Sequence, residues 1–139
     1  MYKNILLASD GSDHSIRAAD HAIHIATCNE NASLTILYVE SHRDAKTNTL
    51  QNWNSPEGFY VLDDKFAEIE EKARKANINY HVATIFGEAG TAIVEHANNG
   101  DFDMVIVGSR GLNGFQEMML GSVSHKVAKR VQCPVLIIK

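Results

Sequence analysis

The residues best suited to bind a ligand follow a short apolar run late in the chain. They form two groups, Gly108-Ser109-Arg110-Gly111 directly after the run 104–107 and Gly121-Ser122-Val123-Ser124 at the start of a helical segment. Glycines let a backbone approach a ligand closely, because they lack a Cβ atom. The first N–H groups of a helix have no partner inside the helix and can bind an anion, and Ser122 and Ser124 add hydroxyl donors. The residues alone favour a phosphate cradle and a loop with an N-cap serine about equally.

Two further sets of polar groups follow earlier apolar runs. Ser9-Asp10-Gly11-Ser12-Asp13 comes after the first run. The carboxylate of Asp10 could bind ribose hydroxyls or a phosphate-bound metal. Alternatively, Asp10 or Ser12 caps the next helix while Asp13 complements the helix dipole. The main chain at Val39-Glu40, after the second run, offers N–H and C=O groups that could contact the edge of a base.

Short apolar runs alternate with helical stretches along the whole chain, and these elements must position the candidate groups. The sequence predicts strands over residues 2–8, 34–39, 80–86, 104–107 and 135–138, and helices over residues 12–27, 63–77, 91–98 and 122–131. Four of the runs are almost continuously apolar, which is typical of strands covered on both faces. The run 80–86 alternates and suits a sheet edge. Residues 42–60 are polar and lack sustained periodicity, which predicts a long connecting loop.

The order of these elements predicts one α/β domain over residues 1–139, a doubly wound parallel sheet with helices on both faces. Such sheets bind ligands at the carboxyl ends of the strands, where the strand order reverses. The usual orders, 2-1-3 and 3-2-1-4-5, both put the first strand beside that point. The loops after the first, second and fourth strands are therefore the expected site.

Composition narrows the class of protein. The chain has 139 residues, 45% of them hydrophobic and 22% charged, and a formal net charge of −4. This balance argues against a nucleic-acid binder, which normally shows a basic field. The longest apolar runs are too short to cross a membrane. Two cysteines, Cys28 and Cys133, do not suggest a disulfide scaffold and are interpreted as small packed thiols. We expect a soluble, cytoplasmic protein without nucleic-acid or membrane partners.

The seven histidines do not suggest a metal centre. His14, His21 and His24 fall with Arg17 on one polar face of the first predicted helix. His21 and His24 are three residues apart and could share a metal ion, but no further ligand is obviously placed to complete a site. A solvated helix face is therefore the favoured interpretation.

The order and spacing of these motifs resemble the universal stress protein family. The pattern Gly108-x2-Gly111-x9-Gly121-Ser122 matches its nucleotide-binding signature, and the segments 5–12, 37–39 and 133–138 resemble its first, second and last strands. The resemblance covers the chain apart from residues 42–60. It implies a five-stranded sheet of order 3-2-1-4-5 and the subclass that binds ATP. Ala89 is a departure, since many relatives have proline there.

The resemblance also implies a role for individual residues. Asp10 would contact the sugar end of the nucleotide, the main chain of Val39 the adenine, and Val107 and Gly108 the ribose. Gly111 and residues 121–124 would hold the phosphates, within reach of Arg110. The full expected set is Ala8, Asp10, Val39, Val107, Gly108, Arg110, Gly111, Gly121, Ser122, Val123 and Ser124.

The favoured function is an ATP-binding regulatory module of the stress response. It would bind ATP, ADP or AMP with Mg²⁺ or Mn²⁺ held mainly through the phosphates, because a chain of charge −4 repels a bare polyphosphate. The alternatives are a slow ATPase or nucleotidyl transferase, and an interaction protein that binds no nucleotide. Hydrolysis needs a positioned base, and Asp10, Arg110 and His125 are the only candidates. An unidentified protein partner is expected. A homodimer through the last strand, Val135, Leu136, Ile137 and Ile138, is expected because an apolar edge strand invites pairing.

Overall fold

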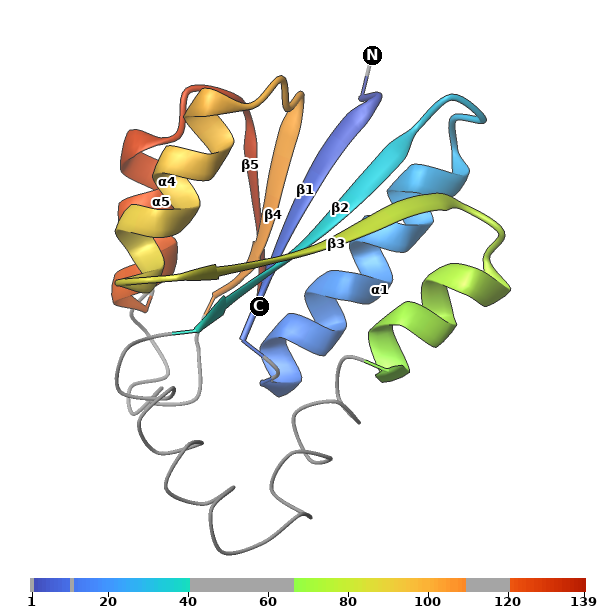
Figure 1. The fold of residues 1–139 in the computed structure, drawn as a ribbon, viewed down its shortest axis with the longest axis horizontal. Coiled ribbons are helices and arrows are strands. Elements are labelled where there is room, and N and C mark those ends of the chain that lie inside the picture. Colours follow the sequence, from blue (N-terminus) through green and yellow to red (C-terminus); the bar gives the residue numbers. More distant parts are fainter. Residues whose placement is uncertain (1, 11, 41–66, 110–120) are drawn as a thin grey trace, which may run out of the picture.

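Five parallel strands form the centre of the molecule (Figure 1). The computed structural model describes residues 2–10, 12–40, 67–109 and 121–139. The sheet has the order β3-β2-β1-β4-β5, which confirms the predicted order 3-2-1-4-5, and every neighbouring pair is parallel. Its strands are β1 (Asn4–Ser9), β2 (Ser33–Glu40), β3 (Asn79–Phe86), β4 (Met104–Gly108) and β5 (Val135–Ile138).

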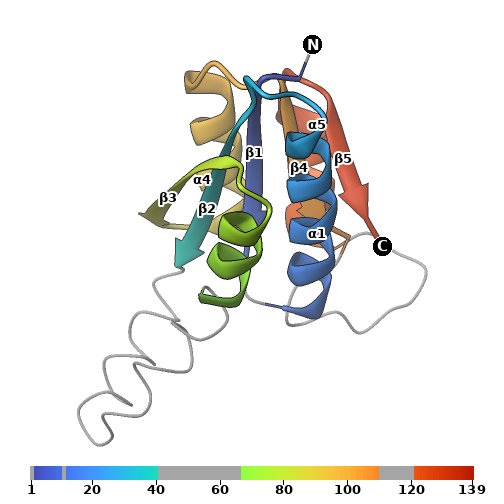
Figure 2. The ribbon, with the colours of Figure 1, turned by 90° about the vertical axis from the view of Figure 1, so that its right-hand side faces the viewer.

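Helices cover both faces of this sheet, as the alternating sequence predicts (Figures 1 and 2). One face carries α1 (Asp13–Thr27) and a helix over residues 67–75, and the other carries α4 (Ala89–Asn99) and α5 (Ser122–Arg130). The predicted helix boundaries agree to within two residues wherever they fall on described residues. The predicted loop 42–60 and the first four residues of the predicted helix 63–77 lie outside the described residues.

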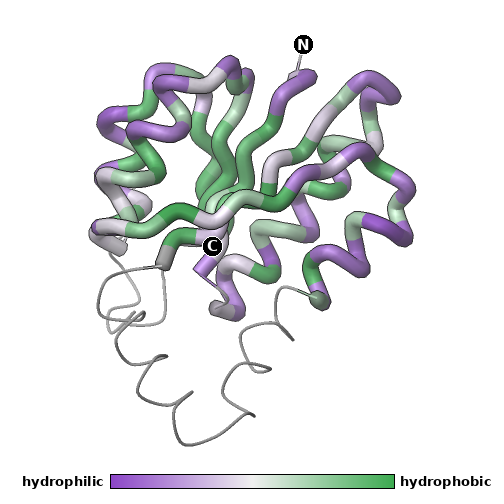
Figure 3. Tube along the Cα trace, viewed as in Figure 1, coloured by the Kyte–Doolittle hydropathy of each residue, from purple (hydrophilic) through white to green (hydrophobic). Residues whose placement is uncertain are grey.

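The central strand β1 explains why its sequence is continuously apolar. Ile5 and Leu7 pack into the core beneath α1, while Leu6 and Ala8 pack into the core beneath α4 and α5. Each of these side chains is buried, so neither face of β1 can carry a polar residue between Asn4, its exposed first residue, and Ser9. Apolar segments accordingly follow the strands, and hydrophilic segments follow much of the helices (Figure 3).

The structure confirms the expected edge position of β3 and corrects the expected packing of Cys28. β3 lies at the edge of the sheet, as its alternation predicts, and leaves Val82 and Phe86 exposed at 43% and 63%. Cys28 is exposed rather than packed, because it caps the exposed end of α1, where its Sγ donates to the carbonyl of His24. Cys133 is half-buried, and burial raises the pKa of its thiol.

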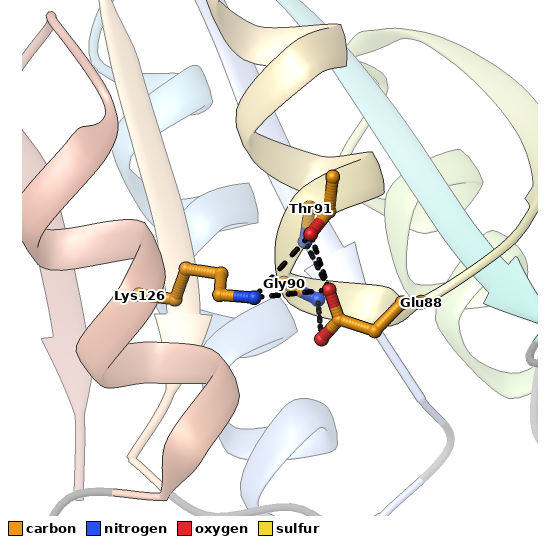
Figure 4. Close-up of polar contacts among 4 residues, drawn as sticks. All are labelled: Glu88, Gly90, Thr91 and Lys126. Carbon is orange, nitrogen blue, oxygen red and sulfur yellow. Dashed lines mark hydrogen bonds and ion pairs between the residues drawn. The ribbon is translucent and has the colours of Figure 1, made fainter.

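A cluster of polar contacts joins the start of α4 to α5 (Figure 4). Glu88 is the N-cap of α4, and its carboxylate accepts hydrogen bonds from the N–H of Gly90 at 3.2 Å and the N–H of Thr91 at 2.9 Å. It also accepts the hydroxyl of Thr91 and, at 3.1 Å, the ammonium of Lys126 from α5. A Cβ atom on Gly90 would lie 2.7 Å from Cδ of Lys126, so the glycine lets the lysine stem pass closely.

These contacts lower the pKa of Glu88 to about 2, from an ordinary value of 4.5. The hydrogen bonds from Thr91 are the largest cause, followed by the one from Lys126. Because the folded pKa is depressed, the carboxylate stabilises the fold above about pH 4.5 and loses that effect as the pH falls toward 2.

We therefore expect the Glu88 carboxyl group to titrate near pH 2 when followed by NMR. Thr91→Val should raise its pKa more than Lys126→Met does, because the hydrogen bond from the threonine hydroxyl is the largest single cause of the lowered pKa. A wild-type pKa near 4.5, or a larger rise in Lys126→Met, would contradict this account of the cap.

Candidate functional site

The candidate site lies at the carboxyl ends of β1 and β4, which are neighbours in the sheet. After β1 the chain turns into α1 on one face, and α5 begins near the end of β4 on the opposite face. This reversal is the point at which open α/β sheets hold ligands. Asp10 follows β1 directly, and Val39 lies one residue beyond Tyr38, the register partner of Ser9. The fold thus brings the predicted Asp10, Val39 and Gly108 to one edge.

Buried polar side chains gather at this edge. In the part of the chain that the structure describes, all the buried polar or charged residues are serines, namely Ser9, Ser12, Ser15, Ser109 and Ser124. They come from the β1–α1 turn, the end of β4 and the first turn of α5. Buried hydroxyl groups need hydrogen-bond partners, so these residues impose a defined geometry on the surrounding turns.

The start of α1 shows that Ser12, not Asp10, is the helix cap. The Ser12 hydroxyl accepts from the N–H of Ser15 at 3.3 Å, and the Ser15 hydroxyl donates to the carbonyl of Ser12 at 2.8 Å. Ser9 donates its hydroxyl to that of Ser15 at 3.1 Å. Asp10 instead orders the turn, since its Oδ1 accepts from the N–H of Ser12 at 2.9 Å. The carboxylate of Asp10 remains partly exposed.

The start of α5 differs from that of α4. Its N-cap is Gly121, at φ −60° and ψ 155°, which makes no side-chain capping bond. The N–H groups of residues 122–124 precede His125, whose N–H donates to the carbonyl of Gly121 at 2.9 Å. In α4 the corresponding groups already bind the carboxylate of Glu88. The first turn of α5 is therefore the better receptor for an external anion.

Ser109 joins the two ends of the glycine motif. Its carbonyl accepts from the N–H of Gly121 at 2.8 Å and from the hydroxyl of Ser124 at 2.8 Å, and its own N–H donates to Ile138 in β5 at 2.7 Å. The prediction that Ser124 offers a hydroxyl to a phosphate is corrected, because that hydroxyl is buried and bonded to the main chain. Ser122 is exposed and Val123 half-buried. Arg110 and Gly111 lie outside the described residues.

Gly108 is required by packing within the protein. A Cβ atom there would lie 2.9 Å from Cβ, 3.0 Å from C and 3.1 Å from O of His14, so β4 and the first turn of α1 touch at this residue. His14 is half-buried and lies beside Arg17, as predicted, with its Nδ1 bonded to Arg17 at 2.9 Å. His21 and His24 are exposed. Sequence reasoning missed this contact, since nothing in the pattern links residues 14 and 108.

Two searches of the described residues address metals and membranes. Across those residues, no group of three or more histidine, cysteine, aspartate or glutamate side chains could hold a metal ion. Among the described helices, none has the length and apolar character needed to cross a bilayer.

The doubly wound parallel sheet, with its strand reversal between β1 and β4, defines the class of protein, and comparison with known proteins identifies the family. The family model described as "Universal stress protein family" matches residues 1–139. Universal stress protein YxiE from Bacillus subtilis is 35% identical, over 100% of both chains. The chain therefore belongs to the universal stress protein family.

Solved structures agree with this assignment. The hypothetical protein MJ0577, whose structure was used to assign its biochemical function, has a TM-score of 0.83 at 27% identity, covering 100% of this chain and 96% of that one. A universal stress protein solved in complex with cAMP has a TM-score of 0.72 at 29% identity, covering 99% of this chain and 97% of its own.

We expect Gly108→Ala to lower the free energy of unfolding by about 1–3 kcal/mol, because its methyl group meets the main chain of His14, which cannot move aside without shifting α1. Gly90→Ala is the matched control. There the new methyl group meets mainly a flexible lysine side chain, and the helix gains from alanine, so stability should fall little or rise. Denaturant unfolding of both variants measures the difference. Equal losses of stability in the two variants would show that the contact with His14 is not what requires a glycine at position 108.

Proposed function

We propose that this protein is a cytoplasmic, ATP-binding module of the stress response that acts through a change in conformation or in partner binding. The observation that carries the proposal is the first turn of α5, which lacks a side-chain cap and is held beside the end of β4 by Ser109. Membership of the universal stress protein family supports it. So does the structural neighbour at 29% identity that was solved in complex with cAMP, an adenine nucleotide.

In this proposal the nucleotide lies along the carboxyl ends of β2, β1 and β4. The main chain of Val39 contacts the adenine, and the partly exposed carboxylate of Asp10 contacts the ribose. Ala8, Val107 and Gly108 line the crevice. The N–H groups of residues 122–124 bind the phosphates, together with Gly111, Gly121 and the side chain of Arg110. The order base, sugar, phosphate follows the order of the strands in the sheet.

A divalent cation accompanies the nucleotide in this proposal. The chain carries a formal charge of −4, so a bare polyphosphate would be repelled over most of the surface. Mg²⁺ or Mn²⁺ bound mainly through the phosphates offsets this repulsion and needs few protein ligands.

Binding, rather than rapid turnover, suits the described residues. Hydrolysis requires a group that positions or deprotonates the attacking water. One oxygen of Asp10 is engaged by the N–H of Ser12, and His125 lies exposed on α5. Any hydrolysis of ATP is therefore expected to be slow, and the proposed output is the bound state itself.

The direct test is acid extraction of the purified protein, followed by chromatography of what is released. Recovery of ATP, ADP or AMP supports the proposal. Protein that carries no nucleotide, and that shows no heat of binding with ATP and Mg²⁺ in calorimetry, would instead support an interaction protein that binds no nucleotide.

We expect Gly121→Val to weaken ATP binding at least tenfold in the same calorimetric experiment. The branched side chain would stand where the phosphates approach the first turn of α5, and the glycine conformation there, φ −60°, is open to other residues. Ala128→Val is the matched control, since it places the same valine side chain at an exposed position of the same helix. Unchanged ATP affinity in Gly121→Val would show that the phosphates do not bind at the first turn of α5.

The last strand is the proposed dimer contact. Among the described strands, β5 pairs only with β4, so its outer edge offers main-chain groups to a second copy. Val135, Leu136 and Ile137 are half-buried, Ile138 is buried, and none of the four is charged. Two such edges, related by a two-fold axis, would pair as antiparallel strands and satisfy each other's main-chain N–H and C=O groups.

Light scattering coupled to size exclusion should give about twice the chain mass of 15.3 kDa for the wild type. Ile137→Lys should halve that mass, because a charge within the contact cannot be buried unpaired. Val82→Lys, on the opposite edge strand β3, should leave it unchanged. A wild-type mass near that of one chain would refute the dimer.

A further inference from the structure

The hydroxyl group of Ser124 has a role that the glycine motif does not describe. Ser124 is the third residue of α5 and is only 2% exposed. Its hydroxyl donates to the carbonyl of Ser109 at 2.8 Å and also lies 3.2 Å from the carbonyl of Gly121. The hydroxyl therefore faces the end of β4 and not the solvent.

The acceptor of this bond is shared. The carbonyl of Ser109 also receives the N–H of Gly121, so two hydrogen bonds tie the first turn of α5 to one atom. Ser109 itself is buried and is fixed to the sheet through its N–H, which donates to Ile138. The start of α5 is in this way connected to β4 and β5 through main-chain groups and one buried hydroxyl.

We propose that Ser124 is a positioning residue whose buried hydroxyl holds the first turn of α5 in the direction needed to bind phosphate. This inference rests on the proposed nucleotide-binding function. The N–H groups of residues 122–124 are fixed to the helix, so their direction follows that of the turn. The hydroxyl of Ser124 acts on the phosphates only through those groups.

The proposal predicts which ligands are affected. A change at Ser124 should lower the affinity for a ligand in proportion to the part of the binding free energy that its phosphates contribute. The base and sugar contacts at β1 and β2 should stay intact. Ser15 provides a matched comparison at the start of α1. It is also buried, and its hydroxyl donates to a main-chain carbonyl at 2.8 Å, but it lies on the Asp10 side of the site.

The test compares ATP with adenosine by NMR titration, which follows weak as well as tight binding. Ser124→Ala should weaken ATP about tenfold, the effect of losing one well-formed hydrogen bond, and change adenosine less than about twofold. Ser124→Cys, which keeps the volume but donates weakly, should show a smaller loss in the same direction. Ser15→Ala, which removes a buried hydroxyl on the other side of the site, should change the affinity for both ligands by the same factor.

Amide hydrogen exchange without nucleotide separates this inference from the proposed function. The N–H of Gly121 should exchange about tenfold faster in Ser124→Ala than in the wild type, and at the wild-type rate in Ser122→Ala. Wild-type protein that binds neither ligand would refute the proposed function. Faster exchange at Gly121 in Ser124→Ala would still show that the Ser124 hydroxyl fixes the first turn of α5. Equal loss of ATP and adenosine affinity, or unchanged exchange, would overturn the positioning role of Ser124.

Discussion

The burial of β1 on both faces is the constraint on which the rest of the structure depends. A strand covered on two sides has to be followed by chain that leaves the sheet, and its neighbour β4 leads to a helix on the opposite side. The two connections leave the sheet on opposite faces, and this reversal is the point at which open α/β sheets bind ligands. The place of the candidate site is thus a consequence of how the sheet is covered.

Serine is well suited to the boundary between the candidate site and the apolar core. A charged side chain at the same depth would need a partner and would carry a large desolvation cost. A serine hydroxyl is small enough to be buried against main-chain carbonyls, as the side chains of Ser15 and Ser124 are. These hydrogen bonds fix the main-chain turns at the starts of α1 and α5.

The sequence predicts the fold well because four strands are continuously apolar and the intervening helices are amphipathic. The parallel sheet and the convergence of Asp10, Val39 and Gly108 follow from this alternation of elements. The edge position of β3 follows from its own alternating residues, and the order 3-2-1-4-5 from the family resemblance. The cap of α4 was missed, because Glu88 is not one of the short side chains that usually cap helices, and the predicted helix began later, at residue 91. Equally, no pattern could show that Ser124 points inward or that Gly108 touches His14, since both depend on contacts between distant segments.

The carboxylate of Glu88 bears on the valence of the protein, that is, on how many helix starts can bind an external anion. Helix starts at one edge of a parallel sheet are potential competitors for the same anionic group, and a protein with several open starts would bind phosphate in several registers. Here α1 begins at the Ser12 hydroxyl and α4 at the Glu88 carboxylate, so both carry an acceptor of their own. Of the described helices whose first residue is placed, α5 alone begins without one. Among these described helix starts the molecule is in this respect monovalent, and in the proposed function a polyphosphate meets one uncapped turn, that of α5.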